Sequence, residues 1–109
     1  MGLLRAFSYS KDGTSLVVLA NPTIIVNGQQ TISITDTAVP LVSVSTSVAG
    51  VIIQALAANS GNVYVGDASV TTADGFELQP GQATSVAIDN LDKIYINGTV
   101  SDGVCFIAS

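Results

Sequence analysis

The chain has 109 residues, enough for one domain around a single apolar core. Its net charge of −5, with only three basic residues, excludes a basic surface for nucleic-acid phosphates. Histidine is absent and the one cysteine excludes an intrachain disulfide, so the common catalytic and zinc-binding patterns are missing. Hydrophobic residues make up 48% of the chain but occur in runs too short to cross a membrane.

The first thirty residues read as two hairpins. Residues 3–9 and 15–20 are predicted strands, joined by a turn at Asp12-Gly13 because this pair adopts positive φ easily. A second hairpin, with strands at 23–26 and 30–35, is predicted around Asn27-Gly28. We expect residues 1–30 to be an N-terminal hairpin region, which either belongs to the core or acts as an arm on a neighbouring subunit.

The middle of the chain predicts two further strands. Residues 42–48 alternate Val or Thr with Ser, which is typical of a strand with one apolar face. Residues 51–57 are apolar on both faces, and their short length favours a strand over a helix. We therefore predict a central strand buried on both sides. Ile32 and Ile34, two residues apart, are expected to face the same way.

From residue 61 onward, short strands alternate with turn signals. Period-two patterning broken roughly every eight to twelve residues is typical of antiparallel sandwiches and barrels. The sequence thus predicts an all-β fold, an antiparallel β-sandwich or jelly-roll-like barrel of about eight to ten short strands. We expect residues 1–109 to form one domain. The turn signals are Gly66-Asp67, Asp74-Gly75, Pro80-Gly81, Asp89-Asn90 and Asn97-Gly98.

Carboxylates are the only candidate catalytic or metal-binding groups. A pair of them could hydrolyse a glycoside, but most of these acids adjoin Gly or Asn in turns, where Asp forms local hydrogen bonds. Asp89, Asn90 and Asp92 offer oxygens to calcium, although their spacing matches no EF-hand, and a turn is the favoured interpretation. We predict no enzyme activity, no catalytic residue, no cofactor and no metal. The candidate acids were Asp67, Asp74, Glu77, Asp89 and Asp92.

The apolar composition predicts a homo-oligomer or a subunit of a larger assembly, because a small monomer would leave much of this surface exposed. Tyr64 and Tyr95 each point opposite to their apolar neighbours, so we predict that they pack against another subunit rather than stack on a sugar. Leu3, Leu4 and Phe7 are the predicted docking residues on the partner.

Five pieces of sequence follow one another between residues 31 and 109, each of which combines a turn with a strand. They are TAVPL at 37–41, VIIQAL at 51–56, NVYVGD at 62–67, DGFELQPG at 74–81 and IDNLDKIYI at 88–96. In this order they resemble a family of small β-sandwich proteins and domains encoded among the structural genes of tailed bacteriophages. Residues 1–30 depart from that pattern.

The resemblance implies a virion structural protein, made in the host cytoplasm and located in the virion. The expected role is capsid decoration or cement, in which the protein bridges capsid subunits as a homo-oligomer, a trimer. Its partners would be other copies of itself and the major capsid protein or another virion protein, with no nucleic acid and no membrane. The alternative is a neck, tail or fibre accessory domain that binds a host glycan or receptor through loops 67–76 and 89–93.

Overall fold

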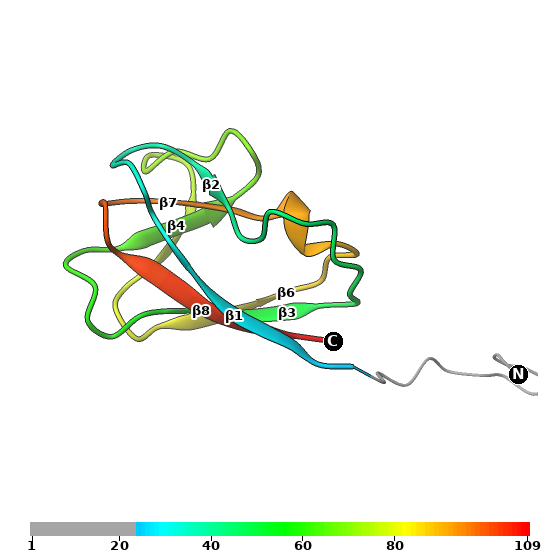
Figure 1. Ribbon diagram of the computed structural model, residues 1–109. Coiled ribbons are helices and arrows are strands. Elements are labelled where there is room, and N and C mark those ends of the chain that lie inside the picture. The colour runs from blue at the N-terminus through cyan, green and yellow to red at the C-terminus, as the bar shows by residue number, and fades with distance from the viewer. Residues whose placement is uncertain (1–23) are drawn as a thin grey trace, which may run out of the picture.

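The computed structural model describes residues 24–109, which form two facing β-sheets with almost no helix (Figure 1). Within these residues, no helix has the length and apolar character needed to cross a bilayer. The elements are β1 Val26–Thr31, β2 Val39–Pro40, β3 Val51–Ala55, β4 Val63–Gly66, β5 Phe76–Leu78, β6 Ala83–Val86, the 3₁₀ turn η1 Leu91–Lys93, β7 Tyr95–Asn97 and β8 Gly103–Ala108.

The strand order is that of an eight-stranded jelly roll. Sheet A has the order β1-β8-β3-β6 and sheet B the order β2-β7-β4-β5, and all pairings are antiparallel. The pairs β1–β8, β2–β7, β3–β6 and β4–β5 together correspond to one long hairpin rolled into two sheets. The predicted all-β sandwich is therefore confirmed.

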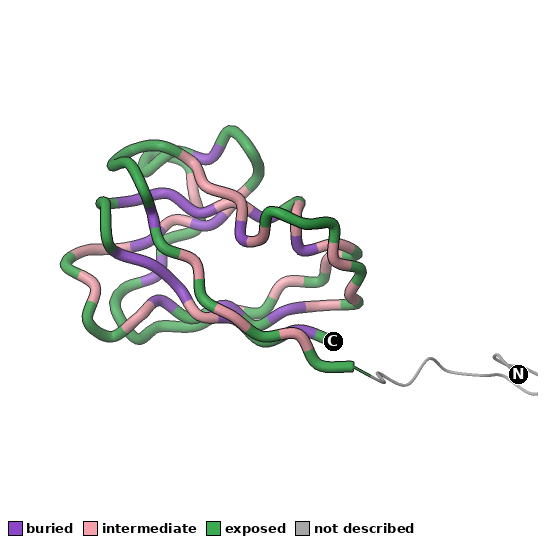
Figure 2. The backbone as a smooth tube through the Cα atoms, viewed as in Figure 1, coloured by how far each residue is buried: buried purple, intermediate pink, exposed green. Residues whose placement is uncertain are grey.

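The core lies between the sheets and follows from period-two alternation along each strand. In β3 the burial pattern alternates, with Val51, Ile53 and Ala55 buried, and Val63 and Val65 repeat the pattern in β4. Figure 2 shows the buried positions recurring along the strands of both sheets. The remaining core residues are Ile32, Leu41, Leu78, Leu91, Ile94, Ile96, Val104, Phe106 and Ala108.

The predicted turn at Asn27-Gly28 is wrong, because both residues lie inside β1. Gly28 pairs with Phe106 of β8, and a Cβ on Gly28 would lie 3.0 Å from the Cζ atom of the Phe106 ring. The glycine thus makes room for an aromatic ring instead of reversing the chain. Since β1 belongs to sheet A, the sandwich includes residues 26–30. The hairpin predicted at residues 3–9 and 15–20 lies outside the described residues.

The predicted strand at residues 42–48 is also wrong. This segment forms one isolated bridge, between Ser47 and Asn90, and Val44 is 69% exposed. The Asn90 side chain binds the segment instead: its Oδ1 accepts the Thr46 N–H at 2.8 Å, and its Nδ2 donates to the Ser45 hydroxyl at 2.8 Å. Side-chain hydrogen bonds therefore replace the strand ladder expected from the alternating sequence.

Strand β3 is central in sheet A, as predicted, but it is not buried on both sides. Ile52 is 51% exposed, and Gln54 is also exposed. The prediction that Ile32 and Ile34 face the same way is wrong, because the strand ends at Thr31 and Ile34 lies exposed in the following turn.

The predicted turn at Pro80-Gly81 is confirmed. Gly81 has a φ of 84°, and the Gln82 N–H donates to the Gln79 carbonyl at 2.8 Å. Pro at the second position and a positive φ at the third are typical of a type II turn. The turn joins β5 of sheet B to β6 of sheet A.

Candidate interaction surface

The most distinctive surface of the described sandwich is the outward side of sheet A, which carries no charged residue. The same alternation that buries Ile53 and Phe106 turns Ile52 and Ile107 outward. We call this surface the outer face of sheet A. It consists of Asn27, Gln29, Thr31, Ile52, Gln54, Ala83, Ser85, Cys105 and Ile107.

The strand register arranges these side chains in rows across the sheet. Ile52 pairs directly with Ile107 on β8, and 51% and 49% of these two residues remain exposed. Neighbouring positions on both sides are uncharged. One row is Asn27, Ile107, Ile52 and Ser85, and the next is Gln29, Cys105, Gln54 and Ala83.

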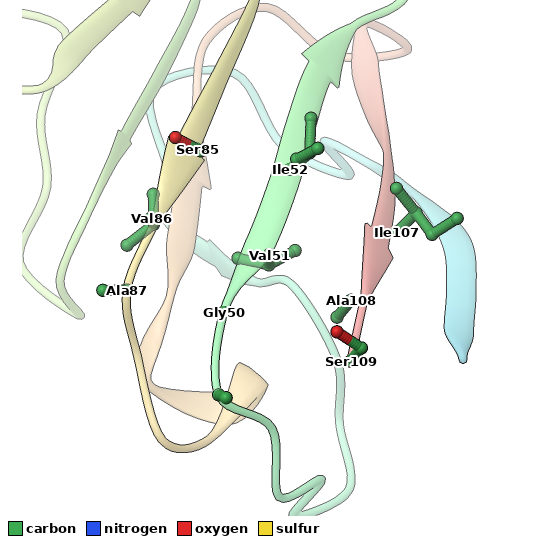
Figure 3. A pocket seen from close by; sticks show the side chains of 10 residues that line it. Gly50, Val51, Ile52, Ser85, Val86, Ala87, Ile107, Ala108 and Ser109 are labelled. Carbon is green, nitrogen blue, oxygen red and sulfur yellow. The ribbon is translucent and has the colours of Figure 1, made fainter. Parts of the chain in front are cut away.

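A groove of about 510 Å³ opens at the end of this face where β3 begins and β8 ends. Figure 3 shows it from close by, with Ser85, Val86 and Ala87 on one side and Ile107, Ala108 and Ser109 on the other. Gly50 has no side chain to fill the space, and the other small residues deepen it. The backbone beneath is held by the Ser109 N–H, which donates to the Gly50 carbonyl at 3.2 Å.

The charged residues of the described chain lie elsewhere. They occupy the loops, the turns and β5, so the sandwich has an uncharged side and an acidic remainder. Removing a charged group from water costs much free energy, whereas an uncharged surface loses little hydration free energy on contact with another protein. The charged residues at 24–109 are Asp36, Asp67, Asp74, Glu77, Asp89, Asp92, Lys93 and Asp102.

The outward side of sheet B differs, because the β4–β5 loop folds back over it. Val70 of this loop is buried, and the buried Asn97 side chain donates to its carbonyl at 2.9 Å. Cβ atoms on Gly66 and Gly75 would lie 2.7 and 2.8 Å from the Val70 Cγ2 atom. Within residues 24–109, the chain therefore covers much of the outward side of sheet B but no loop covers the outer face of sheet A.

Tyr64 and Tyr95 lie on this outward side of sheet B, not on the uncharged face. Tyr64 pairs with Asn97 and Tyr95 with Gly66, so the two tyrosines are diagonal neighbours on adjacent strands. Both are half-buried. Tyr64 also contacts the chain's own loop, since a Cβ on Gly75 would lie 2.6 Å from its Cβ. Their predicted packing against another subunit stays a prediction, and Leu3, Leu4 and Phe7 lie outside the described residues.

Sequence reasoning missed the outer face of sheet A, although a signal existed. Residues 24–31, 49–58, 83–88 and 103–109 contain no charged residue. The fold places these four uncharged runs on neighbouring strands. The four runs form one surface only because β1 pairs with β8. The hairpin predicted at residues 27–28 would have broken β1 and removed this pairing.

Two of the candidate acids, Asp67 and Asp74, accept hydrogen bonds within their own loop. The Asp67 Oδ1 accepts the Ser69 N–H at 3.0 Å, and the Asp74 Oδ1 accepts the Thr71 N–H at 2.8 Å. The bonds from Thr71 lower the pKa of Asp74. In the part of the chain that the structure describes, no three His, Cys, Asp or Glu residues gather closely enough to hold a metal ion.

Two of the three proposed calcium ligands, Asp89 and Asn90, also have partners within the chain. Asp89 lies 2.9 Å from the Lys93 ammonium, and its pKa is lowered by the hydrogen bond and the charge of that lysine. The Asn90 Oδ1 accepts the Asp92 N–H at 3.1 Å and so begins the 3₁₀ turn. The favoured interpretation of these residues as a turn agrees with these contacts.

A second hollow, of about 470 Å³, lies where the edge strands β5 and β6 leave the sandwich open. Val65, Val86 and Ile88 form much of its apolar wall. Asp67, the exposed Phe76 and Lys93 also line it, so it brings together the two loops named as the alternative binding surface.

Comparison with known proteins identifies no relative. No protein-family model matches the chain, and no curated protein or solved structure matches it either. Jelly rolls occur in viral capsid proteins and in lectins, and one fold serves many functions. The choice between these roles therefore depends on the surfaces described above.

Proposed function

We propose that the protein is a structural component of a tailed-phage particle, where it decorates the capsid as a homo-oligomer, a trimer, and bridges capsid subunits. The observation that carries this proposal is the uncharged outer face of sheet A, with Ile52 and Ile107 each about half exposed. The resemblance of residues 31–109 to phage structural proteins points in the same direction. The role requires no catalytic group, cofactor or metal.

An uncharged face favours protein contact for a physical reason. Burying Ile52 and Ile107 removes apolar surface from water, at about 25 cal/mol per Å². No ionic group of this face has to lose its hydration, so the gain is not offset by a large desolvation penalty. Small gains repeated over many copies would strengthen a capsid against internal pressure. The acidic remainder would face solvent and limit non-specific association.

The first test is the presence of the protein on particles. Particles of the phage that encodes it are purified and probed with an antibody against the protein. We expect it at a constant ratio to the major capsid protein, and we expect deletion particles to lose their DNA at a lower temperature. Absence from purified particles would refute the proposal.

A second candidate function is supported by the hollow between β5 and β6. Its lining combines an exposed aromatic ring, Phe76, with a carboxylate at Asp67 and an ammonium at Lys93. A ring face for stacking beside polar groups suits a saccharide, so the domain could hold a host glycan on a neck, tail or fibre. Loops 67–76 and 89–93 would then form the contact surface.

A glycan array separates this role from the first. We expect a glycan binder to lose its signal in Phe76→Ala and to keep it in Val44→Ala, since Val44 is similarly exposed but lies in the 41–50 loop. If no glycan binds at high protein concentration, the second candidate is excluded and the decoration role is unaffected.

A further inference from the structure

The groove on the outer face of sheet A lies at the point where residues 1–23 join the described sandwich. Val26, the first residue of β1, pairs with Ala108, which lines the groove. Ile24 and Ile25 precede it and are 63% and 69% exposed. In Figure 1, the start of the described chain extends past the end of β8. The N-terminal segment is therefore attached at the rim of an apolar groove.

The sequence of this segment is suited to such a groove. Residues 16–20 read LVVLA, five consecutive apolar residues without a charge. A strand that is apolar on both faces needs cover on both. The groove offers Ile52 and Ile107 beside small residues, and none of its lining side chains is charged.

Charge also favours contact between this segment and a sandwich of the same kind. Arg5 and Lys11 are two of the three basic residues of the chain, and both lie in the segment, with Asp12 as its acid. In residues 24–109, Lys93 is the basic residue among acidic ones. Opposite charges on the segment and the sandwich would steer the two together and penalise a wrong register.

We propose that residues 16–20 of one copy lie in the groove of a second copy, so that copies are joined by exchanged N-terminal segments. This inference rests on the proposed homo-oligomeric function. A return of the segment to the chain's own groove would have to reverse the chain next to Ile24 and Ile25, which are mostly exposed instead of packed on the sheet.

The proposed contact is head-to-tail, because the segment and the groove are different surfaces. Contacts of this type close into rings when the rotation between copies permits, and a trimer is one such ring. Each copy would then give one segment and receive one, so that no groove stays empty. The contact would cover the groove and give residues 16–20 an apolar surface on which to pack.

Three variants of the full chain test the exchange. Val18→Asp places a charge in the middle of the apolar segment, and Ile107→Asp places one at the groove. Val44→Asp is the matched control, because Val44 is an exposed apolar residue that does not line the groove. Circular dichroism and denaturant unfolding confirm that each variant keeps the sandwich. Light scattering over a range of concentrations then gives the mass.

We expect the unmodified protein and Val44→Asp to be oligomers. Val18→Asp and Ile107→Asp should each associate at least about tenfold more weakly, because an ionised group would be buried without a partner. An equimolar mixture of Val18→Asp and Ile107→Asp should form a one-to-one complex. The first variant still has a functional groove, and the second still has a functional segment.

Three other results are possible in light scattering, and each of them would overturn the proposed exchange of N-terminal segments. If Val18→Asp remains an oligomer while Ile107→Asp does not, the face binds a second copy without the segment, and the homo-oligomeric function stands. If the mixture stays monomeric although both single variants dissociate, the segment does not cross between copies. If the unmodified protein is a monomer at every concentration, both the exchange and the homo-oligomer fail, and particle binding must be explained by another virion protein.

Discussion

Ile52 and Ile107 lie directly opposite one another on β3 and β8, and each keeps about half of its surface exposed on the outer face of sheet A. Cross-strand neighbours of this kind support each other by roughly 0.2–1 kcal/mol. The pair therefore stabilises the sheet only modestly and leaves two large apolar side chains partly exposed.

A first prediction concerns this pair. Ile52→Thr and Ile107→Thr keep β-branched side chains, so each should lower the free energy of unfolding of the isolated sandwich by less than about 1 kcal/mol. Both should weaken self-association in light scattering, because the apolar contact area is reduced. Unchanged association in the double variant would show that this face is not the interface.

A second prediction compares two adjacent residues of β3. Ile53 is fully buried, whereas Ile52 points outward. Ile53→Ala should lower the free energy of unfolding by about 2–5 kcal/mol, since it leaves a cavity in the core. Ile52→Ala should have a much smaller effect when measured in urea at a concentration where the protein is monomeric. Equal losses at the two sites would contradict the strand orientation.

A third prediction concerns the buried carboxylate of Asp102. It accepts the Ser60 N–H at 2.8 Å and the Gly61 N–H at 3.0 Å, and thereby holds the β3–β4 connection against the start of β8. Asp102→Ala leaves these donors without their acceptor and should destabilise the fold by about 1–3 kcal/mol. Asp36→Asn serves as the control by urea unfolding, because Asp36 lies in an exposed turn with a φ of 62°, a conformation that Asn also adopts readily. A loss as small as in the control would show that water replaces the carboxylate.

A fourth prediction concerns acid pH. The Thr71 N–H and hydroxyl donate to Asp74 and lower its pKa below the ordinary value of 3.8. Because the pKa is lower in the folded state, this carboxylate stabilises the fold above its ordinary pKa, and the stabilisation disappears as the pH falls through the folded value. At neutral pH, the free energy of unfolding of Asp74→Asn should therefore be lower than that of the unmodified protein. In strong acid, the two free energies of unfolding should converge. A carboxyl titration by NMR measures the pKa directly.

Much of the fold could be predicted from residues 61–109. Alternation around the turn signals predicts the strands in this region, and Gly81, with its φ of 84°, occupies the predicted turn. The wrong predictions concern segments whose structure depends on contacts with residues far away in the sequence. Gly28 is next to Phe106 in space, and no local pattern reveals that an aromatic ring lies against this glycine.

The candidate surface was less predictable than the fold. Residues 51–57 were predicted to be a strand buried on both sides, but β3 ends at Ala55 and its Ile52 side is exposed, because composition shows that a segment is apolar and does not show what covers it. Tyr64 and Tyr95 were correctly expected to point away from the core. Nothing in their local sequence shows that the β4–β5 loop, through Val70, covers part of their side of sheet B.

The pairing of β1 with β8 has a consequence for how the protein acquires its structure. Strand β8 occupies an inner position of sheet A, between β1 and β3, although it is the last strand to be synthesised. Sheet A therefore cannot close until residues 103–108 have left the ribosome. Folding dominated by such distant pairings is slow. During that delay β1 has no partner strand and β3 has only β6 beside it, so rapid translation at high copy number should favour aggregation, and slower synthesis at low temperature should raise the yield of folded protein.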